Sequence, residues 1–409
     1  MELRIDGERL WSRLMEMAAI GGTPKGGVCR LALTDLDREG RDLFCRWARE
    51  AGCTIDIDSM GNIFARRAGT DPSAAPVAAG SHLDSQPTGG KYDGALGVLA
   101  ALEVIDALND GDIATVAPVE AVCWTNEEGA RFAPAMIGSG VHAGAFDLAY
   151  AHSRTDAEGL TMGDELSRIG YRGTTECGDH ALGAHFELHI EQGPILEREN
   201  IEVGILTGVQ GIRWYELIVT GSEAHAGPTP MDLRRDPVPV MAKLVPGIYA
   251  AATDSGDAAR CTLGIVSAEP GSPNTVPGKV RVTIDFRHPD TGELDRMDER
   301  LRALVAGHGN EPCPIALTEI WHSPPITFAP SCIDAVTQAA DTCSLSARRM
   351  VSGAGHDSVY LSSVAPAGMV FIPCKDGLSH NELEETSREQ AENGANVLLH
   401  AVLRTAGRP

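Results

Sequence analysis

The sequence predicts an α/β protein in which a mostly parallel central sheet is accompanied by a smaller, inserted β-α-β-β-α-β (ferredoxin-like) domain. Its 409 residues are too many for one ordinary core. The first half alternates short apolar runs with helical patterns, and the order of elements changes from about residue 208. The α/β pattern then returns. We therefore expect one domain built from residues 1–207 and 326–409, and an inserted domain from residues 208–325.

The larger domain shows three clear strand patterns and one clear helical pattern. Each strand is a short apolar run that ends where polar residues begin. The strands are expected at 77–82, 118–124 and 185–190. A helix is expected at 94–109, because apolar residues recur there at helical spacing. They form one stripe, which consists of Leu96, Leu99, Leu102 and Ile105.

The inserted domain has the order strand, helix, strand, strand, helix, strand. Residues 279–287 alternate between apolar and polar side chains, which is typical of a strand with one buried face. The strands are expected at 213–220, 261–268, 279–287 and near 313–321, and the helices at 236–253 and 291–306. This order is that of the split βαβ sandwich.

Composition narrows the possible partners. The hydrophobic fraction of 43% and the charged fraction of 22% are those of an ordinary globular protein. A net charge of −23 argues against nucleic acid and anionic membranes as partners. No apolar run reaches the roughly 18 residues of a membrane span, and the charged N-terminus does not resemble a signal peptide. The ten cysteines are scattered without a CxxC pair, so we expect reduced thiols in a cytoplasmic protein.

The polar residues at the strand ends are of the types that bind divalent metals. His82 and Asp84 lie at the end of the first strand, Glu127 and Glu128 after the second, and His189 within the third. Because ligands bind outside the carboxyl ends of parallel strands, we expect these side chains to meet in one crevice. A single histidine at a strand end is more often structural, and a Glu-Glu pair is more often solvated. The hypothesis of a metal site therefore depends on the fact that histidines and carboxylates occur at comparable positions, at the ends of all three expected strands.

Nine short motifs carry a resemblance to a known family. In chain order they are SHLDS, GGKYDG, TNEEGARF, HIEQGP, AHAGPTPM, PNTVPG, DFRH, SGAGHD and LSHNE. The set closely resembles the amidase, hydantoinase and carbamoylase branch of the M20 metallopeptidase superfamily. That branch includes N-carbamoyl-L-amino acid hydrolases, β-ureidopropionases and allantoate amidohydrolases. The resemblance runs from about residue 10 to about residue 400.

The resemblance implies a centre of two divalent ions in the larger domain, with Zn, Mn, Co and Ni all suited to its ligands. Glu127 is implied as the general base, and Asp84 is expected to orient His82 through the second nitrogen of that ring. The ligands carried over are His82 and His189 for one ion, Glu128 and His380 for the other, and Asp93 as the bridge between them.

The inserted domain is implied to act in dimerisation and in the active site of a second subunit. His225 in AHAGPTPM would stabilise the tetrahedral oxyanion formed in that other subunit, so a homodimer is expected. Asn274 and Arg287 resemble the family's clamp for a substrate carboxylate, and the planar fork of an arginine suits that role.

Two further motifs are expected to contact the substrate. Gln192 in HIEQG is an expected substrate contact, and Gly355 in SGAGHD offers a backbone donor. No role follows for His356 and Asp357 in the same motif.

The implied activity is hydrolysis of the carbamoyl C–N bond of an N-carbamoyl-L-amino acid, which gives the amino acid, ammonia and carbon dioxide. The substrate is thus a small ureido or amide compound that carries a carboxylate. Allantoate and β-ureidopropionate present the same two groups and remain alternatives. An aminoacylase or dipeptidase is a more distant one. A binding protein without activity is disfavoured, because the base and all five proposed ligands are present.

Overall fold

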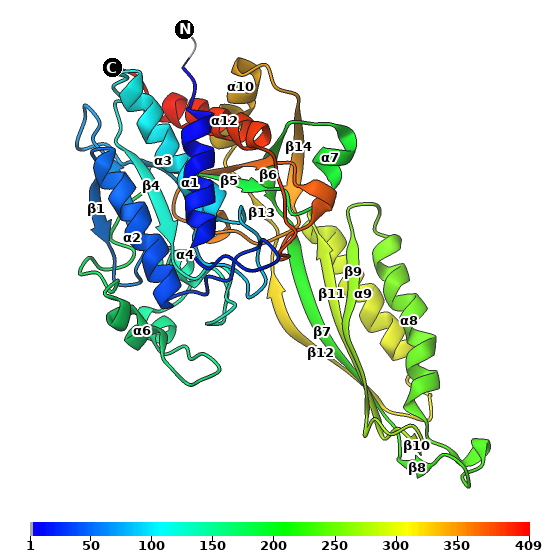
Figure 1. Cartoon of the computed structure of the whole chain (residues 1–409). Coiled ribbons are helices and arrows are strands. Elements are labelled where there is room, and N and C mark those ends of the chain that lie inside the picture. Colours follow the sequence, from blue (N-terminus) through cyan, green and yellow to red (C-terminus); the bar gives the residue numbers. More distant parts are fainter. Residues whose placement is uncertain (1–2) are drawn as a thin grey trace. The chain divides into compact units, whose positions relative to one another are not determined.

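The computed structural model describes residues 3–409, and the chain forms two compact units (Figure 1). We call Met1–Thr207 together with Thr327–Pro409 unit 1, and Gly208–Ile326 unit 2. Each unit has its own sheet with helices packed on it.

Unit 1 contains a mixed nine-stranded sheet. Eight strands follow the order β1-β2-β4-β3-β5-β15-β6-β13, and β14 pairs with β6. The central strands β4, β3, β5 and β15 are parallel, whereas β2 and β6 pair antiparallel with the two sides of this group. The strands are β1 Thr54–Ile57, β2 Ile63–Arg67, β3 Val77–His82, β4 Val119–Trp124, β5 Ala184–Ile190, β6 Val203–Val209, β13 Ile326–Thr327, β14 Ala347–Ser352 and β15 Ala367–Ile372.

The helices of unit 1 include long ones that pack on the sheet and short ones in the connections (Figure 1). They are α1 Gly7–Ala19, α2 Asp35–Glu50, α3 Ala95–Asp110, α4 Ile137–His142, α5 Leu148–His152, α6 Met162–Ile169, α7 Ile195–Glu199, α10 Pro330–Thr342, α11 Ser358–Leu361 and α12 Arg388–Ala406, with a short 3₁₀ turn at Lys375–Gly377.

Helix α3 is buried far more completely than a one-sided stripe would require. Val98, Ala101 and Val104, which lie outside the expected stripe, are buried as well. Even Glu103 is fully buried, and its carboxylate accepts hydrogen bonds from the Arg9 guanidinium. The expected helix and its apolar stripe are confirmed, and burial extends beyond the stripe because α3 packs against strands of the sheet and against helices α1 and α12.

The parallel strands end level with one another at one edge of the sheet. His82 at the end of β3 pairs in register with Trp124 at the end of β4. In the same way, Ile190 at the end of β5 pairs with Ile372 at the end of β15. The segments that follow these strands therefore begin at the same edge, which is where parallel sheets bind their ligands.

Unit 2 is a four-stranded antiparallel sheet with two helices on one face. Its strand order β12-β7-β11-β9 is that of the ferredoxin-like sandwich. Strand β11 alternates buried and half-buried residues along its length, and its buried side chains join the core formed with the helices. The main elements are β7 Gly211–Thr220, α8 Pro237–Thr253, β9 Arg260–Glu269, β11 Lys279–His288, α9 Thr291–Gly307 and β12 Ile315–Ser323.

A second, two-stranded sheet lies in the connections of unit 2. It pairs β8 (Ala224–His225) with β10 (Thr275–Val276), and a 3₁₀ turn follows at Met231–Leu233. None of the helices within residues 3–409 is both long and apolar enough to cross a membrane. All ten cysteines are present as free thiols.

Candidate metal centre

The first group of side chains at the sheet edge joins His82, Asp93 and His189. One carboxylate oxygen of Asp93 lies 3.5 Å from Nε2 of His82 and 3.1 Å from Nε2 of His189. Both imidazoles are almost fully buried. One candidate ligand atom from each of the three residues lies within 4.8 Å of the other two.

The second group joins Asp93, Glu128 and His380 within the same limit of 4.8 Å. Nε2 of His380 lies 3.3 Å from a carboxylate oxygen of Glu128 and 3.7 Å from the second oxygen of Asp93. The two groups therefore share Asp93, and each group uses a different oxygen of its carboxylate. A carboxylate placed in this way can bridge two cations.

Gly94 allows the segment after Asp93 to approach His82. Its φ angle is +65°, and a Cβ atom at this position would lie 2.4 Å from the His82 imidazole. A side chain here would therefore displace the ring as well as strain the backbone.

Neighbouring backbone groups fix the orientation of both buried histidines. Nδ1 of His82 lies 2.9 Å from the backbone carbonyl of Asp84, and Nδ1 of His189 lies 2.9 Å from the carbonyl of Ile190. Each ring thereby donates its Nδ1 proton and turns its Nε2 lone pair towards Asp93.

The carboxylate of Asp84 has a different task. It lies 3.7 Å from the His82 ring, too far for a hydrogen bond. Its two oxygens accept the backbone N–H groups of Glu127 and Glu128, each at 3.2 Å. Asp84 thus orients His82 through its main chain, and it positions the acidic pair through its side chain.

Glu127 lies next to the first group but outside it. Its carboxylate is 3.5 Å from Nε2 of His82. Burial raises the pKa of Glu127 well above its ordinary value, and the nearby carboxylates of Asp357 and Glu128 raise it further. Burial and the charge of Asp93 raise the pKa of Glu128 to about 8.

This concentration of buried carboxylates tests whether the residues fit divalent ions. Asp93, Glu127 and Glu128 lie together with three imidazoles, and no lysine or arginine is among the described side chains of the two groups. Such a set is costly to bury unless cations compensate it. The donor types and their shared carboxylate fit two divalent metal ions.

Glu384 holds the loop that carries Asp93, and it was not predicted from the sequence. One oxygen of its buried carboxylate accepts the backbone N–H groups of Tyr92 and Asp93, at 2.9 and 3.1 Å. A Cβ atom on Gly90 would lie only 2.0 Å from this carboxyl group, so the glycine makes room for it. The residue lies in LSHNELE, four positions after His380.

Gln192 also contacts Asp93. Its side-chain amide donates a hydrogen bond of 2.8 Å to the Asp93 oxygen that faces His380, and the Ser379 hydroxyl donates another of 2.7 Å to the same oxygen. The buried carbonyl oxygen of the Gln192 side chain has no hydrogen-bond partner among the described residues. Gln192 thus lies beside the candidate metal ligands, and its side-chain oxygen accepts no hydrogen bond from the described residues.

The SGAGHD segment packs behind His189. The His356 ring lies edge-on to the His189 ring with 4.6 Å between centroids, and its Nε2 is 2.9 Å from the Ser352 hydroxyl. Asp357 is fully buried and accepts a short hydrogen bond from Ser139. A Cβ atom on Gly355 would lie 2.9 Å from Cε of Met136, so this glycine packs closely against the Met136 side chain.

In unit 2, His225 and Asn274 lie together. Strands β8 and β10 pair here, and the N–H of Ala226 donates to the carbonyl of Asn274 at 2.9 Å. Nδ1 of the exposed His225 accepts the N–H of Gly227 at 3.1 Å, so the neutral ring carries its proton on Nε2. That proton can be donated to an oxyanion.

Arg287 lies near one end of strand β11 in the unit 2 sheet, and Lys279 lies at the other end. On β11, Lys279 pairs with Thr220 and Arg287 with Ile212. Lys279 and Arg287 are eight positions apart, which corresponds to about 27 Å of strand. The Arg287 guanidinium is held by the Asp285 carboxylate, with Nη2 at 2.8 Å, which the sequence did not predict.

Comparison with known proteins identifies one family over most of the chain. Residues 78–404 match the model of peptidase family M20/M25/M40. The chain is 48% identical to an N-carbamoyl-L-amino-acid amidohydrolase of Rhizobium meliloti, over 98% of this chain and 97% of that one. It is 33% identical to a ureidoglycolate hydrolase of Oryza sativa, over 98% of this chain and 85% of the relative.

A solved structure shows the same fold over the whole chain. It is an amidase of the hydantoinase/carbamoylase family from Burkholderia multivorans, with 54% identity, a TM-score of 0.96 and 100% of both chains covered. The match of the family model, the identity to curated relatives and the likeness of fold agree. This chain belongs to peptidase family M20/M25/M40.

Proposed function

We propose that this protein hydrolyses the carbamoyl C–N bond of N-carbamoyl-L-amino acids and releases the amino acid, ammonia and carbon dioxide. The observation that carries the proposal is the sharing of Asp93 between two groups of histidine and carboxylate ligands, with Glu127 beside them. The choice of substrate is supported by the relative named N-carbamoyl-L-amino-acid amidohydrolase, which is 48% identical, against 33% for the ureidoglycolate hydrolase.

Enzymes of this family are metal-dependent, and we propose two divalent ions per subunit, with Zn, Mn, Co or Ni as suitable metals. His82 and His189 would hold one ion, Glu128 and His380 the other, and Asp93 would bridge them. When bound, such ions lower the pKa of a water molecule and polarise a carbonyl oxygen.

Glu127 is the proposed general base. It takes a proton from the attacking water, the water oxygen bonds to the ureido carbon, and Glu127 returns the proton to the amino-acid nitrogen as the bond between that nitrogen and the ureido carbon breaks. The carbamic acid that leaves decomposes to ammonia and carbon dioxide. Burial raises the pKa of Glu127, which makes its carboxylate a stronger base towards water than a solvated glutamate. Asp84 keeps this side chain in place through the backbone N–H of Glu127.

The positions of the unit 2 residues support an active site shared between two subunits. About 27 Å of strand separates the Asn274 end of the sheet from Arg287, so one copy cannot place both on the same small carboxylate. We propose that Arg287 comes from one subunit, and Asn274 and His225 from its partner. His225, with its proton on Nε2, would then stabilise the oxyanion.

Unit 2 also offers a surface for a second copy. Strand β9 lies at the edge of its sheet, and Ile265 and Val266 on it are 46% and 68% exposed. An edge strand with exposed apolar residues is a ready pairing surface for another chain. We therefore propose a homodimer through unit 2. The ten free thiols support the cytoplasm as its compartment.

A substrate panel tests the proposed activity. Chelated protein is reloaded with each metal and assayed with N-carbamoyl-L-amino acids, β-ureidopropionate, allantoate, ureidoglycolate, acyl amino acids and dipeptides. We expect metal-dependent ammonia release, with the highest kcat/KM on N-carbamoyl-L-amino acids. A higher kcat/KM on allantoate or β-ureidopropionate would change the assigned substrate but leave the assigned reaction, hydrolysis of a ureido C–N bond, in place. Preferred release of amino acid from acyl or dipeptide substrates would contradict the ureido assignment.

A further inference from the structure

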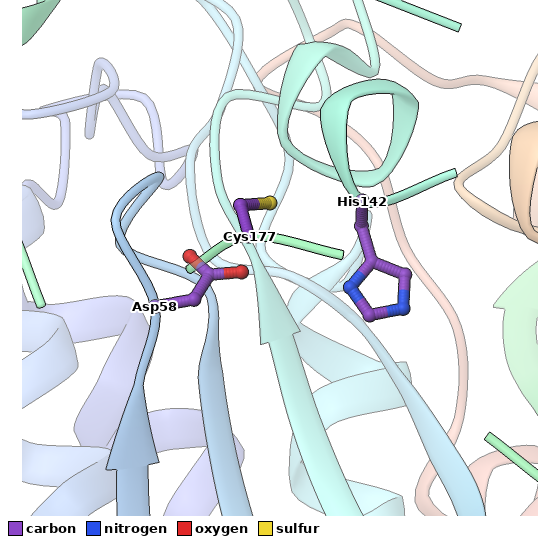
Figure 2. Close-up of side chains that lie close together, drawn as sticks. All are labelled: Asp58, His142 and Cys177. Atoms are coloured by element: carbon purple, nitrogen blue, oxygen red, sulfur yellow. The ribbon is translucent and has the colours of Figure 1, made fainter. Parts of the chain in front are cut away.

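A second set of metal-ligating side chains lies in unit 1 and shares no residue with the centre described above. Asp58 follows β1, His142 ends the short helix α4, and Cys177 belongs to the segment that precedes β5. Figure 2 shows the three side chains turned towards a common space, with the imidazole on one side and the carboxylate and thiol on the other.

The candidate ligand atoms of these three residues lie within the same distance limit as those of the proposed catalytic ligands. One candidate ligand atom from each residue lies within 4.8 Å of the other two, the same limit that the Asp93 groups meet. A tetrahedral ion with bonds of about 2.0–2.3 Å holds its ligand atoms roughly 3.3–3.8 Å apart. The three side chains therefore need to close in by only about 1 Å.

His142 supplies a second, independent observation. The residue is only 6% exposed, and its Nδ1 is buried without a hydrogen-bond partner among the described residues. A ring nitrogen faces the side on which Asp58 and Cys177 lie (Figure 2). A buried polar atom without a partner is rare in folded proteins, and a bound ion can supply the partner that such an atom lacks.

Asn62 positions the Asp58 carboxylate and the Cys177 thiol. Its side-chain amide donates to Asp58 at 2.8 Å and lies 3.6 Å from the Cys177 sulfur. The other oxygen of Asp58 accepts the backbone N–H groups of Met60 and Asn62, at 2.9 and 3.0 Å. Hydrogen bonds of this kind, from residues outside the ligand set, orient ligand side chains around an ion.

We propose that Asp58, His142 and Cys177 bind a further divalent ion of the zinc type. The nitrogen, oxygen and sulfur donors suit Zn²⁺ or Co²⁺, whereas Mg²⁺, Ca²⁺ and Mn²⁺ prefer sites without thiolate. The Cys177 thiol loses its proton to solvent as the metal–sulfur bond forms, and a water molecule completes the coordination. The ion would tie together three segments that are distant in sequence.

Cobalt spectroscopy of the full-length protein tests this site directly. The proposed catalytic ligands contain no sulfur, so a thiolate-to-cobalt charge-transfer band in the near ultraviolet reports a cysteine ligand alone. We expect the chelated wild-type protein to develop this band on titration with Co²⁺. Cys177→Ser should reduce its intensity at least tenfold, whereas Cys261→Ser, which alters a half-buried cysteine of unit 2, should leave it unchanged.

Two results would overturn the proposal. One is a wild-type protein that binds Co²⁺ at saturation but shows no charge-transfer band. The other is a band that persists in Cys177→Ser, which would assign the thiolate to a different cysteine. A folding defect is separated from loss of the site by the thermal midpoint: Zn²⁺ should raise it in the wild type more than in Cys177→Ser, and an equal rise in both would also contradict the proposal.

Discussion

At the scale of single residues, the centre divides its tasks between adjacent carboxylates. Glu128 lies in the group with His380, whereas Glu127 lies beside His82 and belongs to neither ligand group. The Asp84 side chain holds the backbone of both. Two neighbouring glutamates can therefore act as ligand and base without exchanging roles.

Glu127→Gln tests the role of the base. The substitution keeps the size of the side chain but removes the group that accepts a proton, so kcat should fall by about 10²–10⁴-fold. Metal content, measured by elemental mass spectrometry, should stay at the wild-type value. Glu39→Gln, which changes an exposed glutamate of α2, should retain both. Turnover near the wild-type rate in Glu127→Gln would show that Glu127 is not the general base.

Glu384→Ala tests the support of Asp93. Loss of the carboxylate leaves the N–H groups of Tyr92 and Asp93 without their acceptor, and the loop that carries the bridging ligand loosens. We expect metal affinity to weaken by roughly 10–100-fold in a chelator competition assay. Glu385→Ala is the matched control, because the adjacent Glu385 is exposed and pairs only with Lys375 among the described ion pairs. Equal affinity in the two variants would show that Glu384 is not needed.

The residues that the sequence reveals are those at the ends of recognisable strands. His82, Glu127 and His189 could be placed together because parallel strands end at one edge. Glu384 could not be found in this way, because its partners Tyr92 and Asp93 lie almost 300 residues away and are bound through their backbone. The same holds for the Asp285–Arg287 pair, since nothing in an alternating strand indicates which charged neighbours will pair.

At the scale of elements, strands with strong patterns were placed within two residues of their observed ends. Strand β3 occupies the expected residues 77–82, and β11 extends the expected 279–287 by one residue. Helix α3 occupies residues 95–110 where 94–109 were expected, and its burial beyond the apolar stripe follows from packing on several sides. The pair β8–β10 was missed, because two-residue strands carry no periodicity.

Arg41 of helix α2 forms a buried ion pair within the helix and donates a hydrogen bond to a carbonyl outside it, which gives a stability prediction. Arg41 and Asp37 are both fully buried, 2.8 Å apart, and Arg41 also donates to the carbonyl of Gly61 at 2.8 Å. Arg41→Met leaves the Asp37 carboxylate without its cation and should lower the free energy of unfolding by about 3–5 kcal/mol.

The exposed Arg46 on the same helix is the control. It pairs at the surface with Glu16, so Arg46→Met should change the free energy of unfolding by less than about 1 kcal/mol. Urea unfolding followed by circular dichroism measures both variants. Equal stability of Arg41→Met and Arg46→Met would show that the buried pair does not anchor the helix.

At the scale of the whole molecule, the proposed shared active site needs two copies of the chain. In the proposed shared site, His225 and Asn274 come from one copy and Arg287 from the other. Sequence pattern alone does not reveal such an assembly, because the separation of Lys279 from Arg287 along the unit 2 sheet follows only from the register of β11. The shared site was expected from the family resemblance alone.

Mixing two inactive variants tests the sharing. His225→Ala and Glu127→Gln each disable every site in their own homodimers. A mixed dimer pairs an intact Glu127 with the partner's intact His225 in one of its two sites. After subunit exchange in an equimolar mixture, activity should recover to about one quarter of the wild-type value. No recovery in mixed dimers verified by mass spectrometry would place all catalytic groups in one subunit.

The central claim is that Asp93 lies between two divalent cations, and anomalous X-ray diffraction from crystals grown with Zn²⁺ or Mn²⁺ tests it most directly. The account predicts two anomalous peaks about 3.5–4 Å apart on opposite sides of the Asp93 carboxylate. One peak should contact His82 and His189, and the other Glu128 and His380. A single peak at this edge of the sheet, or a pair of peaks that Asp93 does not join, would contradict it.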